Sequence, residues 1–269
     1  MLWNAKNGRL RIDDTVMDFV RFGNGPRRLL ILPGLGDGLT TVRGKALPLA
    51  AGYRLFLKDY TVCVLSRRAR LREGCTTRDM ARDAARALRL LSFGPADVLG
   101  VSQGGMIAQH LAADYPAWVD RLALAVTAPR ANDGLRDAVN HWIGLARRGA
   151  RTALMTDTAR RIYTPRRYRL YRPLLPLTAM LAPRDMTRFI IQAEACLAHD
   201  ALARLSAIRC PTLVIGGGRD TVVGAAAAGE LAAGIPRSAL YVYEGLGHAA
   251  YEEARDFNRR VLAFLIGDR

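Results

Sequence analysis

The chain has 269 residues, of which 50% are hydrophobic and 24% are charged, a composition typical of one globular domain with a substantial core. No apolar run reaches the roughly 18 residues that a transmembrane helix requires, and the charged N-terminus lacks the pattern of a secretory signal. We therefore expect a soluble, cytoplasmic protein with no membrane partner. The formal net charge is +16, and all but three of the 40 basic residues are arginines. Because no nucleic-acid-binding motif accompanies this charge, we do not expect nucleic acid as a partner.

The first half of the chain alternates continuous apolar runs with amphipathic segments. Apolar runs of this kind are typical of parallel strands that are buried on both faces. The predicted strands are residues 17–22, 27–34, 60–66, 96–102 and 119–128, and the predicted helices are 76–94 and 104–116. Thr76 or Thr77 is the expected N-cap of the first of these helices. The alternation predicts an α/β fold with a mostly parallel, doubly wound sheet.

The alternation stops between residues 129 and 209. Helical patterns at 135–155 and 185–205 flank a segment interrupted by prolines, 164–183. Strand and helix patterns then alternate again, at residues 210–220, 225–233, 238–248 and 252–266. We therefore assign residues 1–128 and 210–269 to an α/β core, and residues 129–209 to an inserted helical subdomain.

A serine lies where a predicted strand turns into a predicted helix. The pentapeptide Gly100-Val101-Ser102-Gln103-Gly104 fits the pattern G-x-S-x-G in the strand-turn-helix context that this motif requires. A nucleophile held on such a sharp turn brings the two backbones close together, so the flanking positions must be glycine. The pattern by itself also fits an ordinary tight connection. The strand before Ser102 and the helix after it favour a nucleophile.

A serine hydroxyl needs a base to accept its proton, and the base needs an acid to orient it. His248 ends the turn Gly245-Leu246-Gly247-His248, which directly follows the strand part of 238–248, and Asp220 follows the strand run at 212–218 in the same way. The chain order Ser102, Asp220, His248 fits a catalytic triad, with Asp133 as the alternative acid. In the simpler interpretation, Asp220 caps the next helix and His248 is a surface residue. The other three histidines are interpreted as packing or surface residues.

With these motifs the chain resembles the α/β-hydrolase fold superfamily, and the segment 104–109 after the serine is similar to small bacterial esterases and enol-lactonases. The resemblance implies that Ser102 is the nucleophile, His248 the general base and Asp220 the acid that fixes the histidine tautomer. It also implies that residues 129–209 form the helical lid of the family.

The resemblance further implies an oxyanion hole made by the backbone N–H groups of Leu35 and Gln103. The family often has His-Gly at the start of the turn that contains the first donor, whereas this chain has Pro33-Gly34. Proline has no N–H group, but the expected donor lies two residues further on. The departure therefore concerns the conformation of the turn more than its role.

A triad of this kind implies acyl transfer through an acyl-enzyme, with no metal and no cofactor. A serine nucleophile argues against the dehalogenase and epoxide-hydrolase branches, which have aspartate at this position. We expect a hydrolase of a carboxylic ester or a lactone. The alternatives are a thioesterase, a carbon–carbon bond hydrolase, and a receptor of the same fold that binds a small ligand without catalysis. The sequence predicts neither the natural substrate nor the oligomeric state.

The inserted segment is rich in arginine. Residues 130–209 contain 15 arginines and no lysine, against six acidic residues. In the densest part, 160–172, tyrosines alternate with arginines, and such a surface can bind carboxylate or phosphate groups. Arg166, Arg167 and Arg169 are therefore candidate substrate-binding residues for a small anionic acyl substrate. The alternative is an ordinary solvated face.

Overall fold

The fold is built on one eight-stranded sheet with the strand order β1-β2-β4-β3-β5-β6-β7-β8. The structure is a computed structural model, and it describes residues 2–267. The strands are β1 (Lys6–Ile12), β2 (Thr15–Phe22), β3 (Arg27–Leu32), β4 (Tyr60–Arg68), β5 (Ala96–Val101), β6 (Val119–Ala125), β7 (Thr212–Gly217) and β8 (Ser238–Tyr243). Strand β2 pairs antiparallel with β1 and β4, and the other pairs are parallel. The predicted α/β fold is confirmed.

Strand β1 was not predicted from the sequence. It forms a hairpin with β2, in which Ile12 pairs with Thr15. Ile12 is its only buried residue, and the remaining side chains are exposed or partly exposed. Because β1 lies at the edge of the sheet and faces solvent, its sequence carries little apolar signal.

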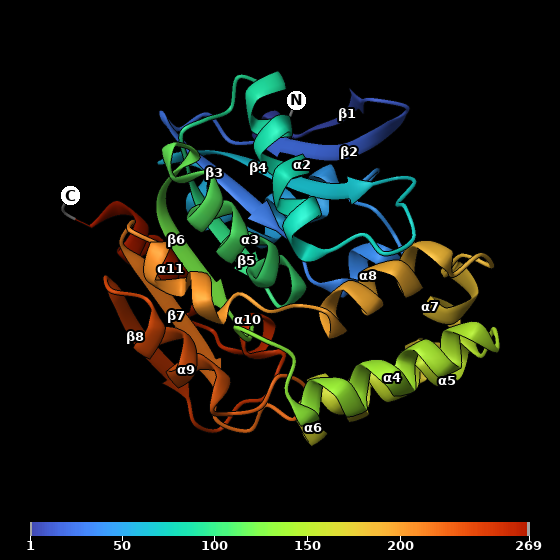
Figure 1. The fold of residues 1–269 in the computed structure, drawn as a ribbon. Coiled ribbons are helices and arrows are strands. Elements are labelled where there is room, and N and C mark those ends of the chain that lie inside the picture. Colours follow the sequence, from blue (N-terminus) through green and yellow to red (C-terminus); the bar gives the residue numbers. More distant parts are fainter. Residues whose placement is uncertain (1, 268–269) are drawn as a thin grey trace.

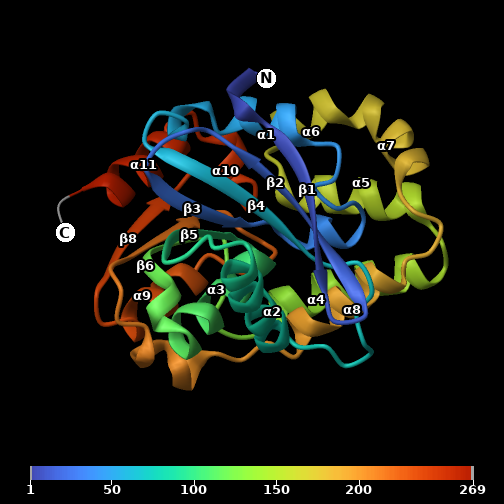
Figure 2. The same ribbon diagram turned by 90° about the horizontal axis from the view of Figure 1, so that it is seen from above.

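Helices cover both faces of the sheet (Figures 1 and 2). Those on one face are α2 (Thr77–Leu90), α3 (Gln103–Asp114) and α9 (Ala227–Gly234), and those on the other are α1 (Ala46–Gly52), α10 (Ala250–Glu253) and α11 (Phe257–Ile266). Thr76 is the N-cap of α2, and it forms a reciprocal capping box with Asp79. No helix among residues 2–267 is long and apolar enough to cross a membrane.

The remaining helices lie between β6 and β7 in the chain, and Figure 1 shows them gathered beyond one end of the sheet. They are α4 (Asp133–Arg147), α5 (Arg151–Ile162), α6 (Pro165–Tyr171), α7 (Leu175–Leu181) and α8 (Thr187–Leu197), and we call them the helical insertion. The predicted helix 135–155 is in fact two helices, because Gly149 has φ +65° between them. The chain leaves and re-enters the core at adjacent points, where Arg130 pairs with Asp200.

Candidate active site

Ser102 lies on a strained turn between β5 and α3. Its φ of 53° and ψ of −120° are rare for a residue with a side chain. The neighbouring positions must be glycine, because other backbone segments pass too close to them to leave room for a Cβ atom. A Cβ atom at Gly104 would lie 1.9 Å from the carbonyl oxygen of Leu32, and one at Gly100 would lie 2.6 Å from the carbonyl oxygen of Gly104. The glycines that surround the serine in the sequence thus allow β5, α3 and β3 to meet at this point.

The structure brings Ser102, His248 and Asp220 together in one hydrogen-bonded line. The Oγ atom of Ser102 lies 2.9 Å from Nε2 of His248. On the other side of the ring, Nδ1 lies 2.8 Å from Oδ2 of Asp220. His248 and Asp220 are 6% and 5% exposed, so this line is largely shielded from water. The histidine, carried by the turn after β8, thus reaches the serine from one side and the acid from the other.

The second carboxylate oxygen of Asp220 is also hydrogen-bonded. Its Oδ1 atom accepts hydrogen bonds from the backbone N–H groups of Val222, at 2.8 Å, and Val223, at 3.0 Å. Burial by itself raises the pKa of Asp220. The interactions with His248 and with these two N–H donors lower the pKa by more than burial raises it, so the pKa lies below its usual value. The acid is therefore an ionised carboxylate in a fixed orientation. Asp133, the alternative acid, is an exposed residue at the start of α4.

Leu35 and Gln103 flank the serine from two different elements. Leu35 is the first residue of the short 3-10 turn Leu35–Gly38, and Gln103 is the first residue of α3. The N–H group of a first helical residue has no acceptor within its own helix. The chain just before Leu35 passes directly against the serine, because a Cβ atom at Gly34 would lie 3.4 Å from the Cβ atom of Ser102. Leu35 lines the cavity at Ser102, and Gln103 follows Ser102 directly at the start of α3.

A cavity of about 730 Å³ opens at Ser102 and His248. Its walls come from the core, including the Leu35–Gly38 turn and Lys45, and from the helical insertion, including Trp142 and Arg167. A volume of this size fits a small organic molecule. Lys45 was not among the predicted site residues, because its place in the cavity depends on the path of the loop after β3.

Of the three candidate substrate-binding arginines, only Arg167 lines this cavity. Arg166 and Arg169 are exposed. The guanidinium carbon of Arg167 lies 4.7 Å from the ring centroid of Tyr171, and its Nε atom is buried with no hydrogen-bond partner among residues 2–267. The structure thus separates three arginines that lie within four consecutive positions of the sequence.

The other histidines lie away from the triad. His199, at the end of the insertion, accepts or donates a 2.9 Å hydrogen bond to Oγ1 of Thr77 through Nδ1, and its ring lies 5.2 Å from that of His110. His141 is exposed on α4. The interpretation of these three as packing or surface residues is consistent with their places in the fold.

The family of the protein follows from this architecture and from its comparison with known proteins. Residues 27–255 match the family model described as alpha/beta hydrolase fold, and the chain belongs to this family. Among curated relatives, a 2-hydroxy-6-oxononadienedioate/2-hydroxy-6-oxononatrienedioate hydrolase from a Pseudomonas species is 26% identical, and the match covers 96% of this chain and 92% of the relative. A pimeloyl-[acyl-carrier protein] methyl ester esterase from Chromobacterium violaceum is 30% identical over 64% of this chain and 70% of its own length.

Solved structures agree with this assignment. An enol-lactonase from Burkholderia xenovorans superposes with a TM-score of 0.83 at 21% identity, covering 97% of this chain and 100% of that one. An α/β hydrolase from a deep-sea metagenome library, MGS-M2, superposes with a TM-score of 0.85 at 21% identity, covering 97% and 98% of the two chains. Together with the named relatives, the fold identifies the chain as a hydrolase, as predicted from the sequence.

Proposed function

We propose that the protein is a serine hydrolase that cleaves a carboxylic ester or a lactone through an acyl-enzyme. The observation that carries this proposal is the hydrogen-bonded line from Asp220 through His248 to Ser102, with contacts of 2.8 and 2.9 Å. A donor and acceptor geometry of this kind is what a nucleophile and its base require. The relatives named as an esterase and an enol-lactonase support the same class of reaction.

In the first half-reaction, Oγ of Ser102 attacks the carbonyl carbon while Nε2 of His248 takes its proton. The new oxyanion receives hydrogen bonds from the N–H groups of Leu35 and Gln103. When the tetrahedral intermediate collapses, the carbon–oxygen ester bond breaks and the histidine gives its proton to the leaving oxygen. Water then attacks the acyl-enzyme with the same base, and the acid product and free Ser102 are released. Asp220 holds the proton on Nδ1 throughout, and no cofactor or metal takes part.

The direct test is labelling with a fluorophosphonate, which reacts with an activated serine whatever the natural substrate. The wild-type protein should be labelled and should hydrolyse p-nitrophenyl esters, whereas Ser102→Ala should do neither and should melt cooperatively. Ser92→Ala serves as a matched control, since Ser92 is exposed and, like Ser102, has a positive φ, of 48°. A Ser102→Ala protein with wild-type turnover would contradict the assignment of the nucleophile.

A carbon–carbon bond hydrolase using the same triad is the second candidate. The relative named as a 2-hydroxy-6-oxononadienedioate hydrolase supports it, because the match runs along nearly the whole of both chains. The two candidates predict different preferences. The ester hydrolase should have a higher kcat/KM for simple esters and lactones than for 2-hydroxy-6-oxononadienedioate, and the reverse order would favour carbon–carbon cleavage.

The cavity further supports an anionic acyl substrate. Lys45 and Arg167 line it together with the carboxylates of Asp37 and Glu252. Asp37 already pairs with an arginine of α8 at 2.6 Å, and Glu252 accepts a 2.6 Å hydrogen bond from the hydroxyl of Tyr163, whereas neither Lys45 nor Arg167 forms a salt bridge among the described residues. Burial lowers the pKa of Lys45, because the ammonium group has lost part of its water. A carboxylate on the substrate would replace that lost solvation. In this proposal the helical insertion is a lid, and it contributes one of the two cations.

The test compares two esters that differ only in a terminal carboxylate. Lys45→Met and Arg167→Gln should each raise KM for the anionic ester and reduce its dependence on salt, while the neutral ester keeps its KM. Arg166→Gln and Arg169→Gln are matched controls, because both arginines lie outside the cavity. Equal changes for the two esters would show that the cavity charge does not select the substrate.

A further inference from the structure

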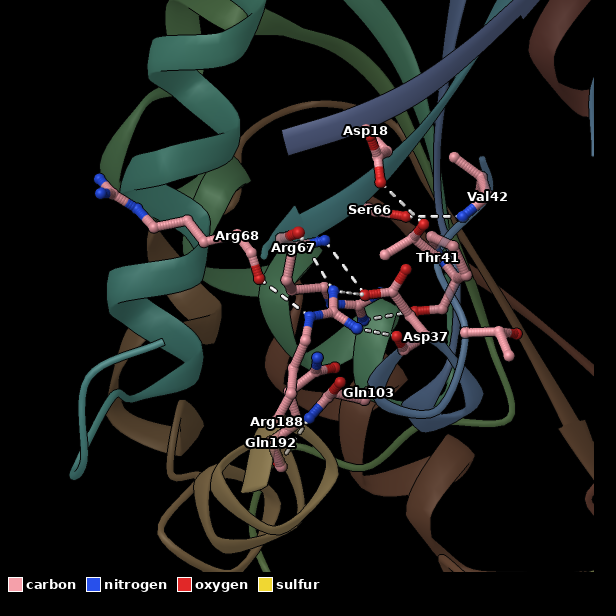
Figure 3. Close-up of polar contacts among 12 residues, drawn as sticks. Asp18, Asp37, Thr41, Val42, Ser66, Arg67, Arg68, Gln103, Arg188 and Gln192 are labelled. Atoms are coloured by element: carbon pink, nitrogen blue, oxygen red, sulfur yellow. Dashed lines mark hydrogen bonds and ion pairs between the residues drawn. The ribbon is translucent and has the colours of Figure 1, made fainter. Parts of the chain in front are cut away.

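Two arginines and one aspartate form a buried cluster next to the Leu35–Gly38 turn. Figure 3 shows Arg67 and Arg188 pointing toward Asp37, the third residue of the turn. Oδ2 of Asp37 accepts a 2.6 Å hydrogen bond from Nη2 of Arg188 and a 3.1 Å bond from the backbone N–H of Arg67. Asp37 and Arg67 are each 4% exposed. Arg188 is partly buried, with 15% of its side chain exposed, and Asp37 also lines the cavity at Ser102.

The arginines also bind the backbone on both sides of Leu35. The Nη2 atom of Arg67 donates to the carbonyl oxygen of Pro33, two residues before Leu35, and Nη1 of Arg188 donates to the carbonyl oxygen of Asp37, two residues after it. The peptide that carries the N–H group of Leu35 therefore lies between two points that are each held by a guanidinium group.

Arg188 links this turn to the helical insertion. It belongs to α8, yet it donates to the carbonyl oxygens of Arg68, at 2.9 Å, and Arg67, at 3.1 Å, at the end of β4. The contact between α8 and the turn is also close, because a Cβ atom at Gly38 would lie 2.8 Å from Cα of Phe189. A shift of α8 must therefore displace either the turn or the bonds of Arg188.

The charges in the cluster do not cancel. Two guanidinium groups face one carboxylate, and Nε and Nη1 of Arg67 have no hydrogen-bond partner among residues 2–267. Burial lowers the pKa of Arg67 to about 10, against the opposing effect of Asp37, so the group stays charged at neutral pH. A buried cation with unused donors is costly to keep. The excess of positive charge lies beside the Leu35–Gly38 turn.

We propose that Arg188 and Arg67 are positioning residues that set the direction of the Leu35 N–H group, and that through Arg188 the docking of α8 controls the oxyanion hole. The inference rests on the proposed serine-hydrolase function. It assigns the insertion a second role besides enclosing the substrate: the Leu35 donor is correctly placed only while α8 is docked on the turn. Neither arginine touches the substrate in this proposal.

The test uses Arg188→Lys and Arg188→Gln in the 269-residue chain. Displacing a reacting group or donor by about 1 Å can cost roughly 100-fold in rate, so kcat should fall by roughly 10- to 100-fold, more for glutamine than for lysine. KM should stay within about twofold, because the donor acts on the transition state. The affinity for a trifluoromethyl ketone inhibitor, whose adduct with Ser102 carries an oxyanion, should fall by a similar factor. A merely structural role would lower the melting temperature without this selective loss.

A second variant moves the turn without changing any charge. Gly38→Ala places a methyl group against α8 and should lower kcat and inhibitor affinity in the same way, whereas Gly229→Ala, which meets no atom within 4 Å, should not. Arg184→Gln, on an exposed residue of the same segment, is the control for arginine removal. Folded Arg188 and Gly38 variants that keep wild-type kcat and inhibitor affinity would overturn the proposal. A wild-type protein that is not labelled by a fluorophosphonate would instead contradict the proposed serine-hydrolase function, on which this inference rests.

Discussion

Replacing Asp220 by asparagine tests the role of the acid more sharply than removing its side chain. Oδ1 of Asp220 accepts from the N–H groups of Val222 and Val223, so the oxygen of the new amide must stay on that side. The amide NH2 then faces Nδ1 of His248, which lies 2.8 Å from Oδ2 in the wild-type protein. Because NH2 donates, Nδ1 must become the acceptor, and the ring proton moves to Nε2. Nε2 can then no longer accept the proton of Ser102.

The expected loss in kcat is on the order of 10⁴-fold, as for other triads held in the wrong tautomer, which corresponds to about 5 kcal/mol of transition-state stabilisation. The assay is steady-state hydrolysis of a p-nitrophenyl ester, with circular dichroism to confirm the fold. Asp133→Asn is the control, since Asp133 is exposed at the start of α4. An Asp220→Asn enzyme within tenfold of the wild-type kcat would refute this assignment of the acid.

Two further predictions concern stability. Because Ser102 has a φ of 53°, Ser102→Gly should relieve strain and be about 1 kcal/mol more stable than Ser102→Ala in urea unfolding; a less stable glycine variant would show that the turn is unstrained. Burial, reinforced by His110, lowers the pKa of His199 from 6.5 to about 3, so between these values the unfolded chain binds more protons than the folded protein. The free energy of unfolding should therefore fall on acidification below pH ~6.5, by up to about 1.4 kcal/mol per pH unit. His199→Gln should flatten that slope; identical slopes for wild type and His199→Gln would contradict the prediction.

Features whose signal lies within a short stretch of chain could be predicted from the amino-acid sequence. The α/β alternation was readable because buried parallel strands are continuous apolar runs, as in β5. The glycines at 100 and 104 marked the sharp turn at Ser102, since any side chain there would overlap the backbone. His248 and Asp220 were found because the carboxyl ends of parallel strands meet at one edge of the sheet, so residues that follow those strands can converge.

Features that depend on contacts between distant segments could not be predicted from the sequence. The edge strand β1 shows little apolar pattern, because its register is set by pairing with β2 and not by burial. Arg167 lines the cavity and Arg166 and Arg169 do not. This difference depends on which side of α6 packs toward the core, and three arginines so close in the sequence do not indicate that side. Asp37 and Arg188 are 151 residues apart and meet only when α8 docks against the turn after β3. A charged pair of this kind leaves no local pattern, because the partner that makes its burial tolerable is supplied by the fold.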